Sequence, residues 1–227
     1  IDCRLFDGQV VRPPQEFREV ARDYVCVRII NINEIDLSLY PFDFDLTMAV
    51  LLANADGEDV QQLRQRLAEY LEVPAASISF AENEWGKPFI ETPSTDLSFN
   101  LSYAGGKALL GVGFRTDIGV DVEALEEARI NPEMINRVLS RPEADSVRHS
   151  GDMKREFYKL WVRKEAMAKA NGWGVGEETT TNLLGLSPVE RDGREVTDLN
   201  IGDEFAAAVA VRAGCEIVLT TGVSVSA

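Results

Sequence analysis

One long amphipathic helix, predicted over roughly residues 153–171, limits how this chain can fold. Apolar side chains recur along a single stripe of it, at Phe157, Leu160, Trp161, Met167 and Ala168. The glycines Gly172 and Gly174 then end the helical pattern. Strand-like runs occupy much of the remaining chain, so the sequence predicts a mixed α+β fold.

Shorter elements fill most of the chain. Runs rich in β-branched residues or with alternating polarity predict strands at 24–32, 78–80, 97–102, 108–114, 118–123, 205–211 and 216–221. Helical spacing predicts helices at 60–71, 132–139 and 143–147, and a further apolar run lies at 46–53. Strands 97–102 and 108–114 flank a Gly-Gly turn and should form a hairpin. Short turns of this kind favour mostly antiparallel pairing.

Composition narrows the class of protein. The chain has 227 residues and a formal net charge of −15, which argues against non-specific nucleic-acid binding. No apolar run approaches the roughly 20 residues of a membrane span. The three cysteines are scattered, as in a cytoplasmic protein rather than a disulfide scaffold. The single histidine, His149, lies in a polar segment and is expected at the surface.

The segment Ile118-Gly-Val-Asp-Val-Glu123 carries two carboxylates on one strand. Strand alternation places Asp121 and Glu123 on one face, roughly 7 Å apart, and the apolar residues on the other. Two such carboxylates repel each other, so a compensating cation is expected, and hard oxygen ligands suit Mg²⁺. The alternative is a half-exposed strand whose outer face is acidic.

The long helix adds a third carboxylate and several cations. Residues 154–169 hold six Lys or Arg against two Glu, a local excess of positive charge in an acidic chain. Glu165 could serve as a further metal ligand or as a base, with Lys164 and Lys169 as a phosphate clamp. The alternative is an ordinary surface pair of Glu165 with Lys169 one turn away, with Lys164 extending outward to solvent.

Four ordered motifs resemble those of the surfactin-type 4′-phosphopantetheinyl transferases. They are Glu84-Trp-Gly-Lys-Pro88, Phe99-Asn-Leu-Ser-Tyr-Ala-Gly105, Ile118-Gly-Val-Asp-Val-Glu123 and Trp161-x-x-Lys-Glu-Ala-x-x-Lys-x-x-Gly-x-Gly174. The segment Leu63-Arg-Gln-Arg-Leu-Ala-Glu-Tyr-Leu71 is similar to the helix that precedes Gly-Lys-Pro in that family. The resemblance covers about residues 60–212.

The resemblance implies a fold and an activity. Such enzymes consist of two similar α/β halves around a cleft, which here would be residues 1–112 and 113–227, with the metal site in the second half. They transfer the 4′-phosphopantetheine group of coenzyme A to a serine of an acyl or peptidyl carrier protein and require Mg²⁺. A monomer is expected, because one chain supplies both halves.

The resemblance also implies roles for individual residues. Asp121, Glu123 and Glu165 would hold Mg²⁺, and Glu165 would accept the serine proton. Lys169 would contact the pyrophosphate of coenzyme A. Other coenzyme contacts would come from Arg64, Lys87, Ser102, Tyr103 and Lys164.

Two departures from the family pattern stand out. Tyr103 occupies the position of a histidine that contacts the 3′-phosphate in the family, and an uncharged phenol predicts weaker coenzyme binding. Residues 1–57 lack the family's early basic segment; they faintly resemble a thioredoxin-like domain without a C-x-x-C, and residues 31–60 contain seven acids and no Lys or Arg. A non-catalytic family member that binds coenzyme A or carrier protein is therefore the alternative function. An unrelated acidic metal-binding or redox module is a third reading.

Overall fold

The computed structural model describes residues 24–31, 58–105, 107–125, 130–173 and 180–221. Its strands are β1 Tyr24–Asn31, β2 Ser79–Glu82, β3 Pro88–Thr92, β4 Leu97–Ala104, β5 Lys107–Phe114, β6 Gly119–Ala124, β7 Val189–Arg191, β8 Arg194–Asp198, β9 Phe205–Arg212 and β10 Glu216–Thr221. Its helices are α3 Glu58–Leu71, the short 3₁₀ helix η2 Ala75–Ser77, α4 Pro132–Val138, α5 Arg141–His149 and α6 Met153–Asn171.

The larger strands form two sheets of four. The first sheet has the order β10-β1-β5-β4 and the second has the order β6-β9-β8-β7, while β2 and β3 pair with each other. Every pairing is antiparallel except that of β1 with β10, which is parallel. The predicted α+β class with mostly antiparallel pairing is confirmed.

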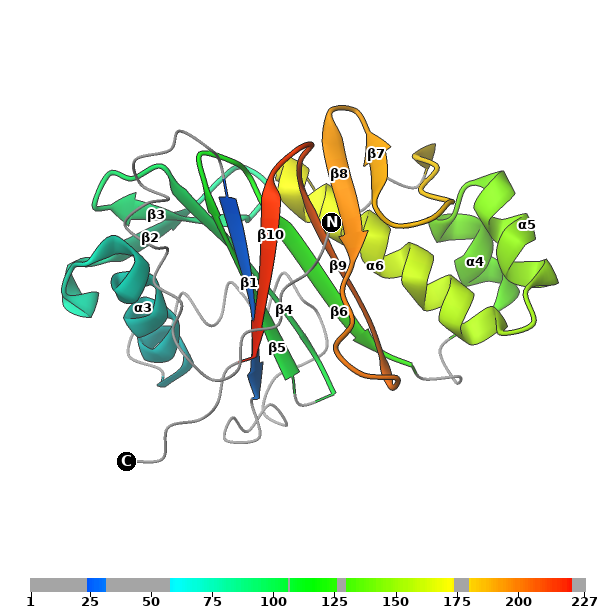
Figure 1. Ribbon diagram of the computed structural model, residues 1–227, viewed down its shortest axis with the longest axis horizontal. Helices are drawn as coiled ribbons and strands as arrows, with labels where there is room; N and C mark the ends of the chain where they lie inside the picture. The colour runs from blue at the N-terminus through cyan, green and yellow to red at the C-terminus, as the bar shows by residue number, and fades with distance from the viewer. Residues whose placement is uncertain (1–23, 32–57, 106, 126–129, 174–179, 222–227) are drawn as a thin grey trace.

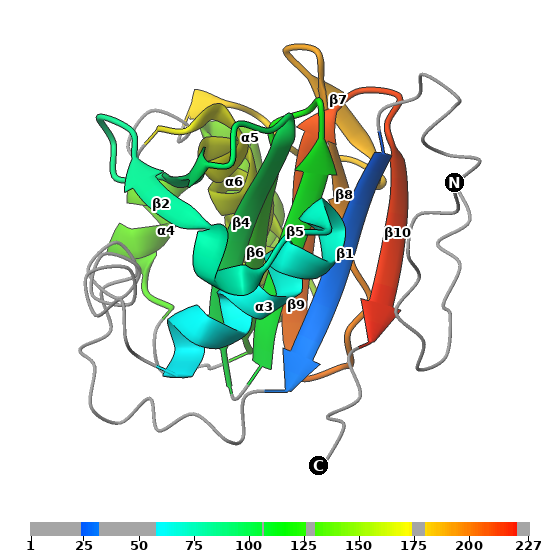
Figure 2. The ribbon, with the colours of Figure 1, turned by 90° about the vertical axis from the view of Figure 1, so that its left-hand side faces the viewer.

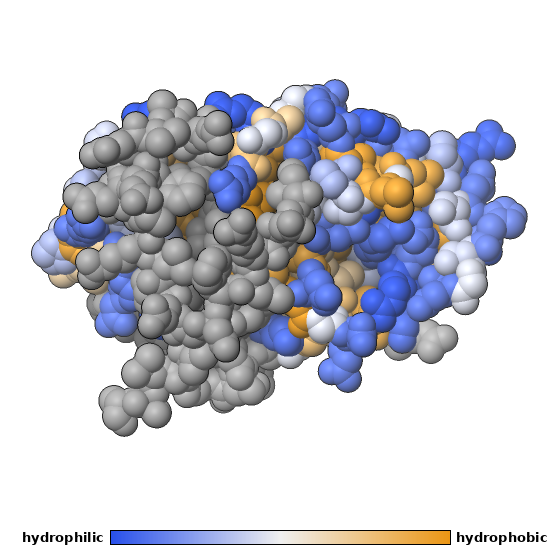
Figure 3. All heavy atoms as spheres, in the orientation of Figure 1, coloured by the Kyte–Doolittle hydropathy of each residue, from blue (hydrophilic) through white to orange (hydrophobic). Residues whose placement is uncertain are grey.

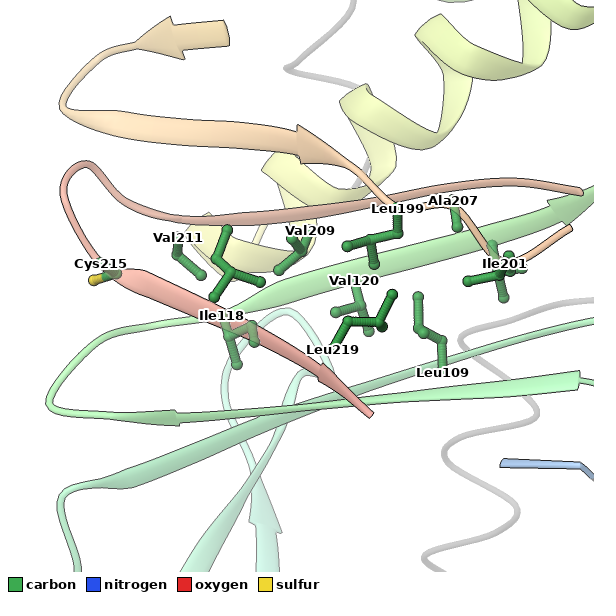
Figure 4. Packing of buried hydrophobic residues seen from close by; sticks show 12 residues of the cluster. Leu109, Ile118, Val120, Leu199, Ile201, Ala207, Val209, Val211, Cys215 and Leu219 are labelled. Carbon is green, nitrogen blue, oxygen red and sulfur yellow. The ribbon is translucent and has the colours of Figure 1, made fainter. Parts of the chain in front are cut away.

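The two sheets lie between helices in four layers, α3, first sheet, second sheet and α6 (Figure 1). Figure 2 shows α3 lying across the outer face of the first sheet. Between the sheets is an apolar core to which β5, β6, β9 and β10 contribute (Figure 4), including Leu109, Val120, Val209 and Leu219. Each fully buried side chain of this size contributes roughly 1.5–3 kcal/mol to folding. This core holds the two sheets against each other.

Each outer helix covers its own sheet face. Leu63 and Leu67 of α3 pack on Phe99 and Leu110 of the first sheet. Val162, Ala166 and Met167 of α6 pack with small residues of the second sheet, such as Ala208 and Ala210. The surface over α4, α5 and α6 is mainly hydrophilic, apart from an apolar area beside β7 (Figure 3). No helix in the described ranges combines the length and apolarity that a membrane crossing needs.

Helix α6 begins and ends where its sequence predicts. The Asp152 side chain accepts a hydrogen bond from the Arg155 N–H at 3.0 Å and so caps the first turn. At the other end Gly172 adopts φ 77°, and its N–H bonds to the carbonyls of Ala168 and Lys169. A left-handed residue of this kind is a common helix stop, and glycine adopts it without strain.

The structure bears out most predicted elements and adds three strands and the short helix η2. The 97–102 and 108–114 hairpin is β4 and β5, each somewhat longer than predicted. Strands β3, β7 and β8 were missed, because their short runs of mixed polarity lack a clear period of two. The predicted apolar run at 46–53 and the thioredoxin-like resemblance fall outside the described residues, apart from β1.

Strand β10 belongs to a different sheet from its neighbour β9. The two follow each other through a short turn, yet β9 pairs with β6 and β8, and β10 pairs with β1. The first sheet therefore takes a strand from beyond the expected division at residues 112 and 113. The expected division into residues 1–112 and 113–227 stays a prediction.

Candidate active site

The two sheets meet at a seam between β4 and β6. These strands lie side by side but belong to different sheets. Side chains of β4, rather than its backbone, accept hydrogen bonds from the backbone of β6. Asn100 Oδ1 accepts a hydrogen bond from the Val120 N–H at 2.8 Å, and Ser102 Oγ accepts one from the Val122 N–H at 3.2 Å. Both β4 side chains are buried, so their polar atoms require such partners. The seam thereby fixes the part of β6 that carries Asp121.

On its other side, β6 is in close contact with α6 at Gly119. A Cβ atom placed on this glycine would lie 2.0 Å from the Ala166 carbonyl oxygen and 2.3 Å from the Ala170 nitrogen. Only a residue without a side chain permits this approach. The strand and the helix that carry the predicted catalytic groups are therefore held backbone to backbone.

Asp121 lies at the centre of the site. The residue is 4% exposed, and its Oδ1 accepts hydrogen bonds from Ser102 Oγ at 2.8 Å and from Lys169 Nζ at 2.6 Å. Its Oδ2 is buried and has no hydrogen-bond partner among the described residues. Burial raises the pKa of this carboxyl group, while the charge and hydrogen bond of Lys169 oppose the rise. The alternative of a half-exposed acidic strand is wrong.

The other two predicted metal ligands lie on the same strand and on the helix that packs against it. Glu123 is half-buried on β6 and accepts a hydrogen bond from Trp161 Nε1 of α6 at 3.2 Å. Trp161 is itself stacked on Phe157, with ring centroids 6.4 Å apart. Glu165 lies on α6 and is buried. Asp121 and Glu123 thus both face α6, as strand alternation predicts.

The arrangement differs from a preassembled metal centre. Among the described residues, no group of three or more His, Cys, Asp or Glu side chains converges as a metal cage. The cation beside Asp121 in this structure is the Lys169 ammonium group. The donor chemistry nevertheless suits Mg²⁺, because the carboxylates are hard ligands and one buried oxygen of Asp121 has no partner within the described ranges.

Lys164 lies in a separate buried cluster. Its side chain is 1% exposed, and its ammonium lies 2.9 Å from Oε2 of the fully buried Glu143 and also donates to the Thr181 carbonyl. Extension of Lys164 to solvent is therefore wrong. Glu143 in addition accepts from the N–H groups of Ser140 and Leu183, each at 2.7 Å. The cluster joins α6 to the start of α5 and to the segment that precedes β7.

Lys87 lies in the loop between β2 and β3, against the end of α6. Its Nζ donates to the carbonyl oxygens of Ile118 at 3.2 Å and Ala170 at 3.4 Å. Burial lowers the pKa of Lys87 to about 8, although the charge of Asp117 opposes this. Asn83 fixes the same loop, because its Nδ2 donates to the Gly172 carbonyl at 3.2 Å.

The remaining two predicted coenzyme contacts lie on the α3 side of the first sheet. The Arg64 guanidinium stands 5.7 Å from the centroid of the Phe80 ring. Tyr103 is half-buried and packs on the apolar cluster beneath α3. Successive strand residues point to opposite faces, so Tyr103 faces away from the seam to which Ser102 points.

Three structurally important residues were not singled out from the sequence. Asn100 lies in a recognised motif, but its bond to the Val120 backbone depends on how the sheets meet. Trp161 was assigned to the core, although its indole N–H reaches Glu123. Glu143 had a readable signal, because the spacing of Ser140 and Glu143 is that of a helix-capping pair.

Comparison with known proteins agrees with this geometry. Residues 117–213, which include β6 and α6, match the 4′-phosphopantetheinyl transferase superfamily. The match confirms the resemblance noted in the sequence, over the segment that carries Asp121, Glu123 and Glu165.

Individual relatives carry the same name. The chain is 30% identical over 132 residues to the 4′-phosphopantetheinyl transferase HetI of Nostoc, covering 56% of this chain and 55% of that protein. It is 34% identical over 110 residues to the 4′-phosphopantetheinyl transferase AcpT of Escherichia coli O157:H7, covering 46% and 55%. A 4′-phosphopantetheinyl transferase of Bacillus subtilis is 30% identical over 115 residues, half of each chain. The chain thus spans about half the length of these curated relatives.

Proposed function

We propose that this chain transfers the 4′-phosphopantetheine group of coenzyme A to a serine of an acyl or peptidyl carrier protein. The observation that carries the proposal is the buried Asp121 carboxylate between Ser102 and Lys169, one oxygen of which has no partner among the residues that the structure describes. The superfamily match over the same strand and helix supports it. Lys169 and Ser102 offset the cost of burying Oδ1, whereas the buried Oδ2 oxygen would gain from a bound cation.

Asp121, Glu123 and Glu165 would hold Mg²⁺. When bound, Mg²⁺ would neutralise charge on the pyrophosphate of coenzyme A. Lys169, whose ammonium is now paired with Asp121, would bind pyrophosphate oxygens and orient them. Lys87 would add a second cation at the C-terminal end of α6.

The chemical step requires a base and produces two products. Glu165 would accept the proton of the carrier serine as its oxygen forms a bond to the phosphorus next to pantetheine. The bond from that phosphorus to the oxygen bridging the two phosphates would break. Adenosine 3′,5′-bisphosphate would leave with the electron pair. Burial of Glu165 keeps bulk water from competing with the serine for this base.

A cytoplasmic monomer is part of the same proposal. Cys215 is buried as a free thiol, in keeping with a reducing compartment. A negatively charged chain is also a poor partner for nucleic acid. A non-catalytic member that binds coenzyme A is the second candidate, and the observation in its favour is Tyr103, which faces away from the seam.

Intact-protein mass spectrometry tests the proposal. Purified apo carrier protein is incubated with the chain, coenzyme A and Mg²⁺, and a mass gain of one phosphopantetheine group is expected. Chelation with EDTA should abolish the gain, and Glu165→Gln should slow it by about a hundredfold or more. Glu156→Gln is the matched control, because Glu156 lies on the same helix but pairs with Lys159.

The negative outcomes are separable. No mass gain with fatty-acid, polyketide and peptide carriers, together with calorimetric binding of coenzyme A, would favour the non-catalytic candidate. Equal rates for Glu165→Gln and the wild type would remove Glu165 as the base.

A further inference from the structure

The hydroxyl group of Ser102 has its hydrogen-bond direction fixed by its neighbours. Three polar groups surround Ser102 Oγ: the Val122 N–H at 3.2 Å, the Lys169 ammonium at 3.4 Å and Asp121 Oδ1 at 2.8 Å. The first two can only donate. The single hydrogen of the hydroxyl must therefore point to Asp121 Oδ1.

The two oxygens of the Asp121 carboxylate therefore have different surroundings. Oδ1 accepts from both Ser102 and Lys169, whereas Oδ2 is buried without a partner in the described part of the chain. A carboxylate held at one oxygen cannot turn freely about its Cβ–Cγ bond. Oδ2 is thus the oxygen that remains for a ligand.

We infer that Ser102 is a positioning residue, which fixes the Asp121 carboxylate so that Oδ2 is presented to the metal ion. This inference rests on the proposed function. It differs from the sequence expectation that Ser102 contacts the nucleotide of coenzyme A. The anchor for Ser102 is the Val122 backbone, so the strand that carries Asp121 also holds the residue that orients it.

The seam explains why a hydroxyl is needed at this position. Asn100, two residues earlier on β4, accepts a hydrogen bond from the Val120 N–H in the same way and so joins the two sheets. Ser102 Oγ accepts the equivalent hydrogen bond from the Val122 N–H, and its own hydroxyl hydrogen is donated to Asp121. Alanine would lose both bonds, whereas threonine would retain the hydroxyl.

The test compares three variants by isothermal titration calorimetry. Mg²⁺ is titrated into the wild type, Ser102→Ala, Ser102→Thr and Ser98→Ala, each saturated with coenzyme A. Ser98 is the matched control, because it lies on the same strand and its Oγ donates at 2.6 Å to the Thr116 carbonyl, away from Asp121. Thermal unfolding of each variant checks that all are folded.

A positioning role makes a distinct set of predictions. The Kd of Ser102→Ala for Mg²⁺ should rise roughly tenfold, as expected for one hydrogen bond to a charged group. Its KM for Mg²⁺ should rise in parallel, with kcat at saturating Mg²⁺ within about threefold of the wild type. Ser98→Ala should stay within about twofold of the wild type, and Ser102→Thr should lie closer to the wild type than Ser102→Ala.

A second titration separates positioning from direct coenzyme contact. With EDTA present, Ser102→Ala should bind coenzyme A as the wild type does. Weakened binding there, or an unchanged Kd for Mg²⁺, would overturn the inference, as would a wild type that binds coenzyme A but no Mg²⁺. A wild type that binds Mg²⁺ but transfers nothing would refute the proposed function and leave the positioning role of Ser102 standing.

Discussion

The contact between β6 and α6 makes Gly119 the most sensitive backbone position in the site. In Gly119→Ala the new methyl group would lie 2.0 Å from the Ala166 carbonyl oxygen, whereas ordinary contact begins at 3.4 Å. Both sides of this contact are backbone, so no flexible side chain can yield. Helix α6 must therefore recede from β6 by more than one ångström.

The cost has a structural and a functional part. Overpacking of a well-packed interface destabilises by typically about 1–3 kcal/mol, and a clash with backbone belongs near the upper end. For a chain of this size that lowers the Tm by roughly 5–10 °C. The same displacement lengthens the 2.6 Å contact between Lys169 and Asp121, so phosphopantetheine transfer should fall more steeply than the folded fraction does.

The assay pairs differential scanning fluorimetry with the mass-spectrometric transfer assay at a temperature where both proteins are folded. Gly151→Ala is the control, because a Cβ there meets no atom within 4 Å and the backbone is not left-handed. It should match the wild type in both assays. A Gly119→Ala protein with a Tm within about 1 °C of the wild type would refute the close approach of strand and helix.

Two further predictions concern the lysines. Lys164→Met should lower the free energy of unfolding, measured in urea, by about 3 kcal/mol, because it leaves the buried Glu143 carboxylate without its lysine partner. Adding Glu143→Gln to this variant should recover part of the loss. Strictly additive losses would contradict a direct ion pair. Lys87 has a pKa lowered to about 8 by burial, so the unfolded chain holds its proton more tightly than the folded chain does. Below about pH 8 the folded protein bears the full cost of burying the charged Lys87 amine, and this cost falls toward pH 10.5 as the amine loses its proton. The free energy of unfolding of the wild type, relative to that of Lys87→Met, should therefore rise by about 1–2 kcal/mol over that window. A constant difference between pH 7.5 and pH 10 would contradict the burial of this amine.

Local patterns in the sequence are sufficient to predict much of the fold. The limits of α6 follow from Asp152 and Gly172, which act within a few residues of the helix ends. The shared face of Asp121 and Glu123 follows from strand alternation alone. Such features depend on neighbours in the chain, so a pattern of residues is sufficient to predict them.

Features that depend on distant contacts could not be read in this way. Lys164 was expected in the phosphate clamp because its motif contains it, but its partner Glu143 lies on another helix. The roles of Asn100 and Ser102 arise only where two sheets meet edge to edge. Their hydrogen bonds join side chains to backbone, and no periodicity in the sequence records such a bond.

The pairing of β1 with β10 has a consequence for how the protein is made. Tyr24 of β1 pairs with Glu216 of β10, so the contact closes a loop of most of the chain. Contacts of such long sequence separation form slowly, because the entropy of closing the loop is lost before the contact is gained. During synthesis β1 can pair with β5 through one edge, while its other edge stays unpaired until β10 has been made. In that interval the growing chain presents an open strand edge, the kind of surface on which aggregation begins.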